Sequence, residues 1–257
     1  GDGGDELFCG YERHVALQRL RHWRWLAAMI PSPLLPRRDP KAITSKLARL
    51  GVAARGAPNS DLAAIFSGPD LAALTGDRLP SGPVDDPGHW DAQFYLGPDL
   101  LRKTDTASMA VALEVRAPFL QRDLATAALA EPLSSLMPRG QRKGLLKAVA
   151  RKYLPDEIVD RPKQGFAIPI SDWFRSDYGG MRQLLLDHLT APDPFPGLEG
   201  AGVHLNMAFV RRMLKEHDDA GEKSLWPWKG RDHGQRLYML LVLSIWCRWL
   251  ERIRQGG

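Results

Sequence analysis

Apolar residues recur at helical spacing along most of the chain, whereas the alternation typical of strands is nearly absent. The pattern predicts longer helices near 5–29, 99–111, 141–153, 204–217 and 233–253, and shorter ones near 44–50 and 61–65. Asp99 is the expected N-cap of the second helix, and Ser171 that of a helix carrying Trp173 and Phe174. The chain is therefore expected to be mainly α.

The longest apolar run extends from Leu237 to Leu250 and is interrupted by Ser244 and Arg248. A membrane-spanning helix needs roughly 20 apolar residues, so this run is too short to cross a bilayer. We expect a helix buried on most sides, and we expect core positions for Trp226, Trp228, Trp246 and Trp249.

Composition and charge narrow the class of protein. With 44% apolar and 25% charged residues among 257, the chain has the composition of a globular protein. The net charge of +5 is spread over interspersed residues and lacks the dense basic stripe of a nucleic-acid-binding protein. Neither nucleic acid nor a membrane is an expected partner. Cys9 and Cys247 match no metal or disulfide spacing, which favours the cytoplasm.

Candidate chemistry begins at the first six residues, which contain three glycines and the carboxylates Asp2, Asp5 and Glu6. Three carboxylates so close together repel one another unless a cation lies among them, and glycine lets the backbone fold tightly around it. The alternative is a surface turn whose acidic residues favour the start of a helix.

Lys163 lies in a segment bounded by proline and glycine, where a restricted backbone can hold a long side chain in place. Lys143, Lys147 and Arg151 recur every four residues and are expected to share one helix face. That face either approaches a triphosphate or is the solvated side of the helix. We favour solvent for Arg151 and leave Lys143 and Lys147 open.

Asp105 has small and apolar neighbours at helical spacing, where a carboxylate is costly unless it is paired. A buried ion pair with Arg116 is the structural alternative to a functional role. For Glu114 and Arg116, we expect a structural pair with each other.

Three blocks carry a family resemblance: residues 1–11 (GDGGDELFCGY), 105–120 (DTASM…EVRAPFL) and 143–166 (KGLLK…LP…RPKQGF). In this order they resemble the asparagine synthetase family, and the resemblance extends to the terminal helix around Asp232-His233. Only the segment from about 31 to 90 is uncovered.

The resemblance implies that residues 1–257 are the C-terminal, helical portion of an α/β domain of the adenine-nucleotide α-hydrolase (ATP-pyrophosphatase) type, with 31–90 as a variable helical insertion. The implied reaction uses ATP and Mg²⁺. The carboxylate of aspartate, or a similar substrate, forms an acyl-adenylate, and an amine that derives from glutamine displaces AMP.

The resemblance also assigns roles. Asp5 is the implied ligand of the Mg²⁺ that holds pyrophosphate, and Asp2 the acid–base group that deprotonates ammonia. Lys163 stabilises charge on the phosphates, and Asp105 faces the substrate end of the site. Lys143 and Lys147 are the further candidates for nucleotide binding.

Two positions depart from the family pattern: Cys9 replaces a common glycine, and Gln121 replaces the usual aspartate after Pro-Phe-Leu. The family's Ser-Gly-Gly-x-Asp-Ser loop does not occur in the sequence. We therefore expect the chain to begin inside the domain, to lack the glutaminase domain that supplies ammonia, and to be inactive alone.

Alternatives are a homologue that amidates a sugar acid or closes a β-lactam ring, and a non-catalytic interaction module. A homodimer is also considered.

Overall fold

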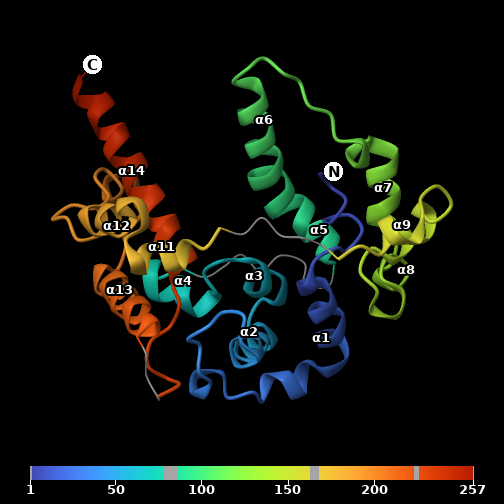
Figure 1. Cartoon of the computed structure of the whole chain (residues 1–257), viewed down its shortest axis with the longest axis horizontal. Coiled ribbons are helices and arrows are strands. Elements are labelled where there is room, and N and C mark those ends of the chain that lie inside the picture. Colours follow the sequence, from blue (N-terminus) through green and yellow to red (C-terminus); the bar gives the residue numbers. More distant parts are fainter. Residues whose placement is uncertain (1, 78–85, 163–167, 223–225, 257) are drawn as a thin grey trace. The chain divides into compact units, whose positions relative to one another are not determined.

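The computed structural model describes residues 2–77, 86–162, 168–222 and 226–256 (Figure 1), and no strand occurs within these ranges. The mainly α prediction is confirmed. The helices are α1 (Glu12–Ala28), α2 (Ile43–Arg55), α3 (Pro58–Ala63), α4 (Gly68–Thr75), α5 (Pro87–Asp91), the π-helix η2 (Ala92–Leu101), α6 (Arg102–Met109), α7 (Arg122–Ala130), α8 (Leu133–Leu136), α9 (Gly144–Ala150), α10 (Asp156–Val159), α11 (Ile170–Ser176), α12 (Met181–Leu189), α13 (Met207–Gly221) and α14 (Gly234–Gly256). In the ranges described, we find no helix with the length and apolarity needed to cross a bilayer.

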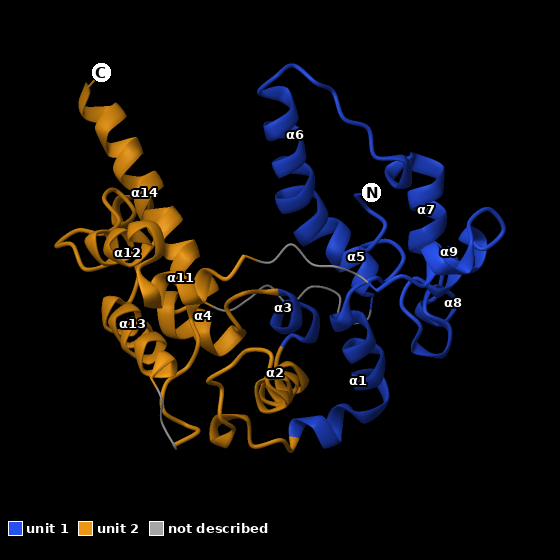
Figure 2. Cartoon of the chain, viewed as in Figure 1, with its two compact units in different colours: residues 1–28, 57–63, 80–165 blue, residues 29–56, 64–79, 166–257 orange. Residues whose placement is uncertain are grey.

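The chain forms two compact units that alternate along the sequence (Figure 2). Unit 1 contains Gly1–Ala28, Ala57–Ala63 and Pro80–Gly165, and unit 2 contains Met29–Gly56, Ala64–Leu79 and Phe166–Gly257. Segment 31–90 contributes to both units, and its status as a variable insertion stays a prediction.

In unit 1, a nearly continuous helical stretch runs through α5, η2 and α6. Asp86 caps its start, because its side chain accepts hydrogen bonds from the N–H groups of Gly88 and His89 at 2.9 and 3.1 Å. Pro98 lies inside the π-helical part, where wider turns shift the hydrogen-bonding register around a residue that has no N–H. The prediction that Asp99 caps a helix was wrong, since Asp99 lies within this stretch.

Two other helices begin later than predicted, because a residue with a left-handed backbone conformation precedes each of them. Cys9 has a φ of 56° and Lys143 a φ of 55°, a backbone conformation that does not continue into an α-helix. For this reason α1 begins at Glu12 rather than near Asp5, and α9 begins after Lys143. Ser171 is not an N-cap either, since it lies inside α11 and its hydroxyl donates to Asp232 at 2.8 Å.

The core of unit 1 is built from apolar residues of the three sequence blocks. Leu7, Phe8 and Cys9 of the first block are buried together with side chains of α7 and α8. Phe119 of the second block packs edge-on against Phe8, with ring centroids 5.8 Å apart. Leu145 of the third block packs against the same cluster. Burial of these side chains is what holds the polar residues of the blocks close to one another.

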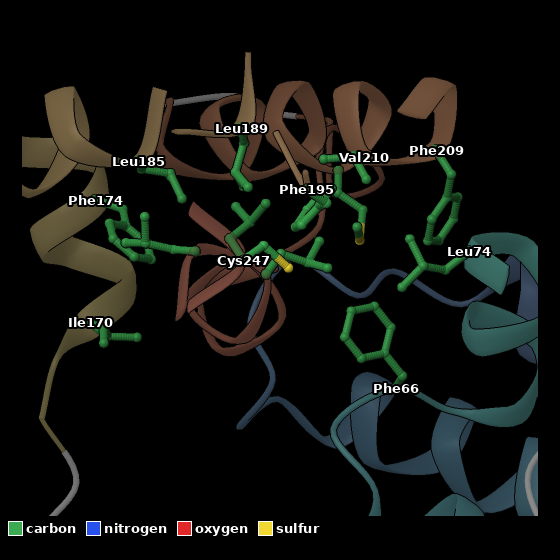
Figure 3. Packing of buried hydrophobic residues seen from close by; sticks show 14 residues of the cluster. Phe66, Leu74, Ile170, Phe174, Leu185, Leu189, Phe195, Phe209, Val210 and Cys247 are labelled. Atoms are coloured by element: carbon green, nitrogen blue, oxygen red, sulfur yellow. The ribbon is translucent and has the colours of Figure 1, made fainter. Parts of the chain in front are cut away.

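The core of unit 2 gathers side chains from α4 and α11–α14 (Figure 3). Its members are buried and mostly aliphatic or aromatic: Phe66, Leu74, Ile170, Phe174, Leu185, Leu189, Phe195, Phe209, Val210, Met213, Leu237, Leu240, Leu241 and Cys247. The predicted helices near 204–217 and 233–253 are confirmed as α13 and α14.

The four tryptophans that we expected in the core are exposed. The exposed fractions of Trp226 and Trp228 are 65% and 49%, and those of Trp246 and Trp249 are 52% and 48%. Helix α14 buries one face, which carries Leu237, and the two tryptophans of this helix lie on the other. The expectation of a helix buried on most sides was therefore wrong.

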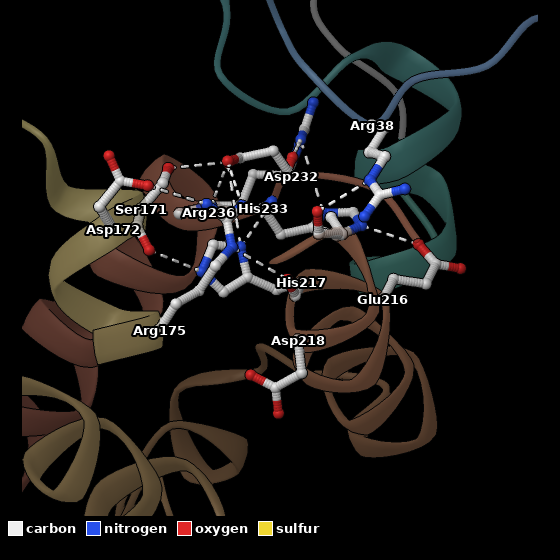
Figure 4. A network of polar contacts seen from close by, with 12 residues as sticks. Arg38, Ser171, Asp172, Arg175, Glu216, His217, Asp218, Asp232, His233 and Arg236 are labelled. Atoms are coloured by element: carbon white, nitrogen blue, oxygen red, sulfur yellow. Dashed lines mark hydrogen bonds and ion pairs between the residues drawn. The ribbon is translucent and has the colours of Figure 1, made fainter. Parts of the chain in front are cut away.

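A polar network connects α11, α13 and the start of α14 in unit 2 (Figure 4). The Asp232 carboxylate accepts hydrogen bonds from Ser171 and Arg175 at 2.8 and 2.5 Å. His217 is buried; its Nδ1 accepts the backbone N–H of His233 at 3.1 Å, and its Nε2 lies 3.3 Å from the carbonyl oxygen of Ser171. Burial is the main cause that lowers the pKa of His217 to about 4, and the positive charge of Arg175 is the second.

This histidine makes stability depend on pH. Because its pKa is depressed in the folded protein, its contribution is present above the ordinary histidine pKa and is lost as the pH falls from about 6.5 towards 4. Between pH 7 and pH 5 we expect the free energy of unfolding to fall by about 2 kcal/mol through His217. Urea titrations of the wild type and His217→Gln at both pH values measure how much of the fall in the free energy of unfolding depends on His217. An equal pH dependence in the two proteins would contradict it.

Candidate active site

Residues 2–9 form an acidic loop of consecutive turns. Two backbone hydrogen bonds stabilise the loop. The N–H of Leu7 donates to the carbonyl of Gly3 at 2.9 Å, and the N–H of Gly10 donates to the carbonyl of Asp5 at 2.8 Å. Gly3 adopts a φ of 88°, and a Cβ at this position would lie 2.4 Å from a methyl group of Leu120. Glycine thus brings the loop into contact with the second block.

The three carboxylates of the loop have different environments. Glu6 is buried and accepts a short hydrogen bond from the hydroxyl of Tyr11. Burial and this carboxylate raise the pKa of Tyr11 well above its usual range, so the phenol stays protonated. Asp2 and Asp5 are only partly buried. Glu6 therefore has a structural role, while Asp2 and Asp5 are accessible for chemistry.

Asp5 meets the third block directly. Its Oδ1 lies 3.0 Å from Nζ of Lys143, and both side chains are partly exposed. The left-handed backbone places Lys143 before α9, so it does not share the helix face of Lys147 and Arg151 as we expected. It points instead to the acidic loop. A Cβ added at Gly10 would lie 1.8 Å from the Asp5 oxygen and 2.4 Å from Cε of Lys143.

Gly10→Ala is expected to push this ion pair apart and to destabilise the protein by about 2 kcal/mol, the usual cost of overpacking. Urea denaturation measures the change. Gly97→Ala is the matched control, because a Cβ there would have only a backbone oxygen at 4.0 Å. Equal stability of the two variants would show that the space at Gly10 is not restrictive.

The left-handed φ of Cys9 gives a physical reason for the glycine that is common at this position, because L side chains adopt this conformation at a cost. Burial, followed by the nearby carboxylates of Asp86 and Asp91, raises the pKa of the Cys9 thiol to about 12. The departure from glycine therefore adds a packed apolar side chain and not a reactive thiol.

Asp2 and Asp105 line one open cavity of about 740 Å³ in unit 1. The hydroxyl of Thr104 donates to Asp2 at 3.2 Å. The cavity is lined by Asp2, Leu101, Arg102, Thr104, Asp105, Val115, Arg116, Ala117, Pro118, Leu120 and Gln121. Asp2, the implied acid–base group, and Asp105, the residue implied at the substrate end, thus line a common space.

Asp105 is exposed, so the alternative of a buried ion pair with Arg116 is wrong. Arg116 pairs with Glu114 at 2.5 Å, as we expected, but both side chains are exposed and such a pair adds little stability. Gln121, which replaces the usual aspartate, makes a local hydrogen bond of its own. Its side chain caps α7 by accepting the N–H of Leu124 at 2.8 Å.

The remaining basic candidates form a surface network. Lys147 and Arg151 both pair with Asp160, at 3.1 and 2.7 Å, and Arg151 also pairs with Asp156 at 3.0 Å. This places Arg151 on a solvated face, as we favoured. Lys163 lies outside the described residues, so its distance from Asp5 stays a prediction.

Sequence reasoning missed a buried ionic cluster behind the loop. Asp91 is buried and accepts hydrogen bonds from Arg13 at 2.8 and 2.9 Å, and it lies 2.8 Å from Nε2 of the buried His14. The guanidinium of Arg13 also stacks on the ring of Tyr11, 3.9 Å from its centroid. Asp91 follows an apolar residue in a stretch without recognisable motifs, so no sequence signal pointed to it.

The surroundings of Asp5 are compatible with a magnesium ion that is shared with a phosphate group. They are not those of a metal site made of protein ligands alone. Mg²⁺ is commonly bound by one or two carboxylates together with substrate phosphates and water. Within the described ranges, no three His, Cys, Asp or Glu side chains are grouped to hold a metal ion. The Asp5 carboxylate is partly exposed and is therefore accessible to such a shared ion.

Residues 1–248 match the family model described as asparagine synthase. The chain belongs to this family. Its fold is thus that of the adenine-nucleotide α-hydrolase class, of which the chain supplies a helical portion. The described parts of the three motif blocks of this asparagine synthase family member, 2–11, 105–120 and 143–162, lie in unit 1.

Among curated proteins, the chain is similar to a putative glutamine-hydrolysing asparagine synthetase of Mycobacterium tuberculosis, with 28% identity over 272 residues that cover 96% of this chain and 38% of the relative. A protein of the same name from Mycobacterium bovis gives the same values. Similarity to glutamine-hydrolysing asparagine synthetase 1 of Bacillus subtilis is 24% over 157 residues, covering 61% of this chain and 22% of that protein. The chain thus spans well under half the length of these relatives. No solved structure matches significantly.

Proposed function

We propose that the protein is an ATP-dependent ligase that converts a carboxylate to an amide through an acyl-adenylate, with aspartate as substrate and glutamine as nitrogen source. One observation carries the proposal: the polar residues of the family blocks gather around the acidic loop, with Asp5 3.0 Å from Lys143 and with Asp2 and Asp105 on one cavity. Family membership supports the reaction type.

In this proposal the Asp5–Lys143 pair is the arrangement of the site without nucleotide. Pyrophosphate carries negative charge, and Mg²⁺, when bound, supplies charge neutralisation at the leaving group. Asp5 would hold the metal ion, and Lys143 would contact a phosphate oxygen. Lys147 and Lys163 are the further candidates for contacts with the phosphates. A cation fixed where charge develops is the arrangement that accelerates such a step.

The chemistry has two steps. A carboxylate oxygen of the substrate attacks the α-phosphorus of ATP, the link to the β-phosphate breaks, and pyrophosphate leaves. Ammonia then attacks the acyl carbon, AMP leaves, and Asp2 accepts the proton. The hydroxyl of Thr104 donates to Asp2 and so holds its carboxylate in place at the cavity. Asp105 orients the substrate from the other wall.

We further propose that turnover needs more protein than these 257 residues, since the similar synthetases are much longer. A glutaminase domain is the proposed source of ammonia. The cytoplasm is the proposed compartment, because Cys9 and Cys247 are both buried and free. A homodimer stays a prediction.

The test is release of pyrophosphate from ATP and Mg²⁺ by the protein in its full natural length, with aspartate, glutamate, a sugar acid or a β-amino acid as the carboxylate. We expect release with aspartate and formation of asparagine when glutamine is added. Release with another carboxylate would keep the ligase and change the substrate. Formation of ADP and phosphate, or release that needs no carboxylate, would contradict the proposal. The 257-residue chain is the paired sample, and we expect no turnover from it.

A further inference from the structure

A second, smaller cavity lies in unit 2 and is distinct from the loop and its motifs. Its volume is about 90 Å³. Its lining combines four arginines with three apolar residues, two serines and an aspartate: Arg37, Pro40, Ser45, Arg49, Val52, Ile65, Ser67, Arg231, Asp232 and Arg236. Four cationic side chains that line one small cavity repel one another unless negative charge compensates them.

The compensation that the structure shows is shared. The Asp70 carboxylate accepts two hydrogen bonds from Arg231, from Nη1 at 2.8 Å and from Nη2 at 2.7 Å. It also lies 3.5 Å from Nη2 of Arg236. Its remaining partner is the hydroxyl of Ser67 at 2.7 Å. One carboxylate therefore serves two guanidinium groups. Asp232, in the wall of the cavity, is bound on its other side by Arg175 at 2.5 Å.

Arg37 adds a third cation whose hydrogen bond goes to a neutral group. Its guanidinium donates to the backbone carbonyl of Ser32 at 2.7 Å, which orients the side chain, while the carboxylates of Asp70 and Glu216 oppose part of its charge. Burial, followed by the charge of Arg231, lowers the pKa of Arg37. The same two causes lower the pKa of Arg236 to about 10. Both shifts mean that the charged forms are held at a cost.

Arg236 also has an unsatisfied donor. Its Nε is buried and has no hydrogen-bond partner within the part of the chain that the structure describes. A buried N–H without an acceptor is destabilising. The penalty adds to the cost of holding the Arg236 charge beside the cavity.

We propose that this arginine cavity binds one tetrahedral oxyanion, namely inorganic phosphate or the phosphate group of a small monoester. Arginine forks match the oxygens of phosphate in geometry as well as charge. The volume of about 90 Å³ has room for one small anion. The proposal is independent of the ligase function, because it uses residues of unit 2 alone.

Isothermal titration of the protein with inorganic phosphate, at constant ionic strength in chloride, tests the site. We expect saturable binding at one phosphate per chain, and a rise in Tm of roughly 3–5 °C at about ten times Kd. Sulfate should compete, whereas acetate should not. Titration with a small phosphate monoester distinguishes the two sources: tighter binding than phosphate favours the monoester, and weaker or no binding favours the free ion.

Arg37→Gln should raise the Kd for phosphate at least tenfold, and Arg37→Lys should raise it less, since charge remains while the fork is lost. Arg37 is chosen because its hydrogen bond goes to a backbone group, and circular dichroism verifies that each variant folds. Arg211→Gln is the matched control, since Arg211 is exposed on α13, and its Kd should be unchanged. No saturable binding, an unchanged Kd in folded Arg37→Gln, or an equal loss in Arg211→Gln would overturn the proposal.

Discussion

Asp5→Asn is expected to lower kcat/KM for pyrophosphate release at least 100-fold. Asparagine keeps the size of the side chain and can still accept a hydrogen bond from Lys143, so the fold is retained. The amide carries no charge, however, and amides are poor substitutes for carboxylates beside Mg²⁺. Removing one group that stabilises a developing anion commonly costs a factor of about 10²–10³. We expect a similar loss when the cation that plays this part is held less tightly.

The measurement is pyrophosphate release from ATP by the protein in its full natural length, at several Mg²⁺ concentrations. We expect partial recovery of Asp5→Asn at high Mg²⁺, which a defect in folding would not show. Asp123→Asn is the control, because Asp123 is an exposed carboxylate of the same unit. A loss of less than threefold in Asp5→Asn would remove Asp5 from the metal site.

Asp91→Ala is expected to destabilise the protein by about 3 kcal/mol. Its carboxylate accepts two hydrogen bonds from Arg13 and lies in contact with the buried His14, so removal leaves a cation and an imidazole without their acceptor. Breaking a buried ion pair from one side costs about 3–5 kcal/mol, and we take the lower value because Arg13 is 15% exposed.

Urea denaturation measures the change, with Asp156→Ala as control. Asp156 is also in an ion pair with an arginine, but 78% of its side chain is exposed, so we expect less than about 1 kcal/mol. Asp91→Asn should fall between the two, since it keeps an oxygen acceptor without the charge. Equal stability of Asp91→Ala and Asp156→Ala would show that the buried cluster contributes no more than a surface pair.

Helical periodicity predicted the longer helices α1, α13 and α14, but it missed α4, α7, α8, α10 and α12 and failed at several helix ends. Periodicity is blind to backbone handedness, and Cys9 and Lys143 are side-chain-bearing residues in a conformation that usually requires glycine. The same limit affected the site. Spacing by four residues grouped Lys143 with Lys147, but the left-handed turn separates them and points Lys143 at Asp5.

Conversely, the tryptophans of α14 show that an aromatic residue in an apolar run is not necessarily buried. Trp246 and Trp249 lie among apolar residues in the sequence, yet they occupy the face opposite to the core of unit 2. The Asp91 cluster could not be predicted, because its partners are far apart in sequence and single charges carry no periodic signal. Motif order was the part of the sequence that did predict proximity.

The alternation of the two units along the chain has a consequence for biosynthesis. Residues 29–56 and 64–79 leave the ribosome well before α11–α14 of the same unit, which follow only after residue 166. Phe66 and Leu74 must therefore wait for more than 90 further residues before their core partners exist. Contacts so distant in sequence form slowly, and a nascent chain with such exposed apolar groups is prone to aggregation. Slower translation, or a chaperone that shields these groups, should raise the soluble yield.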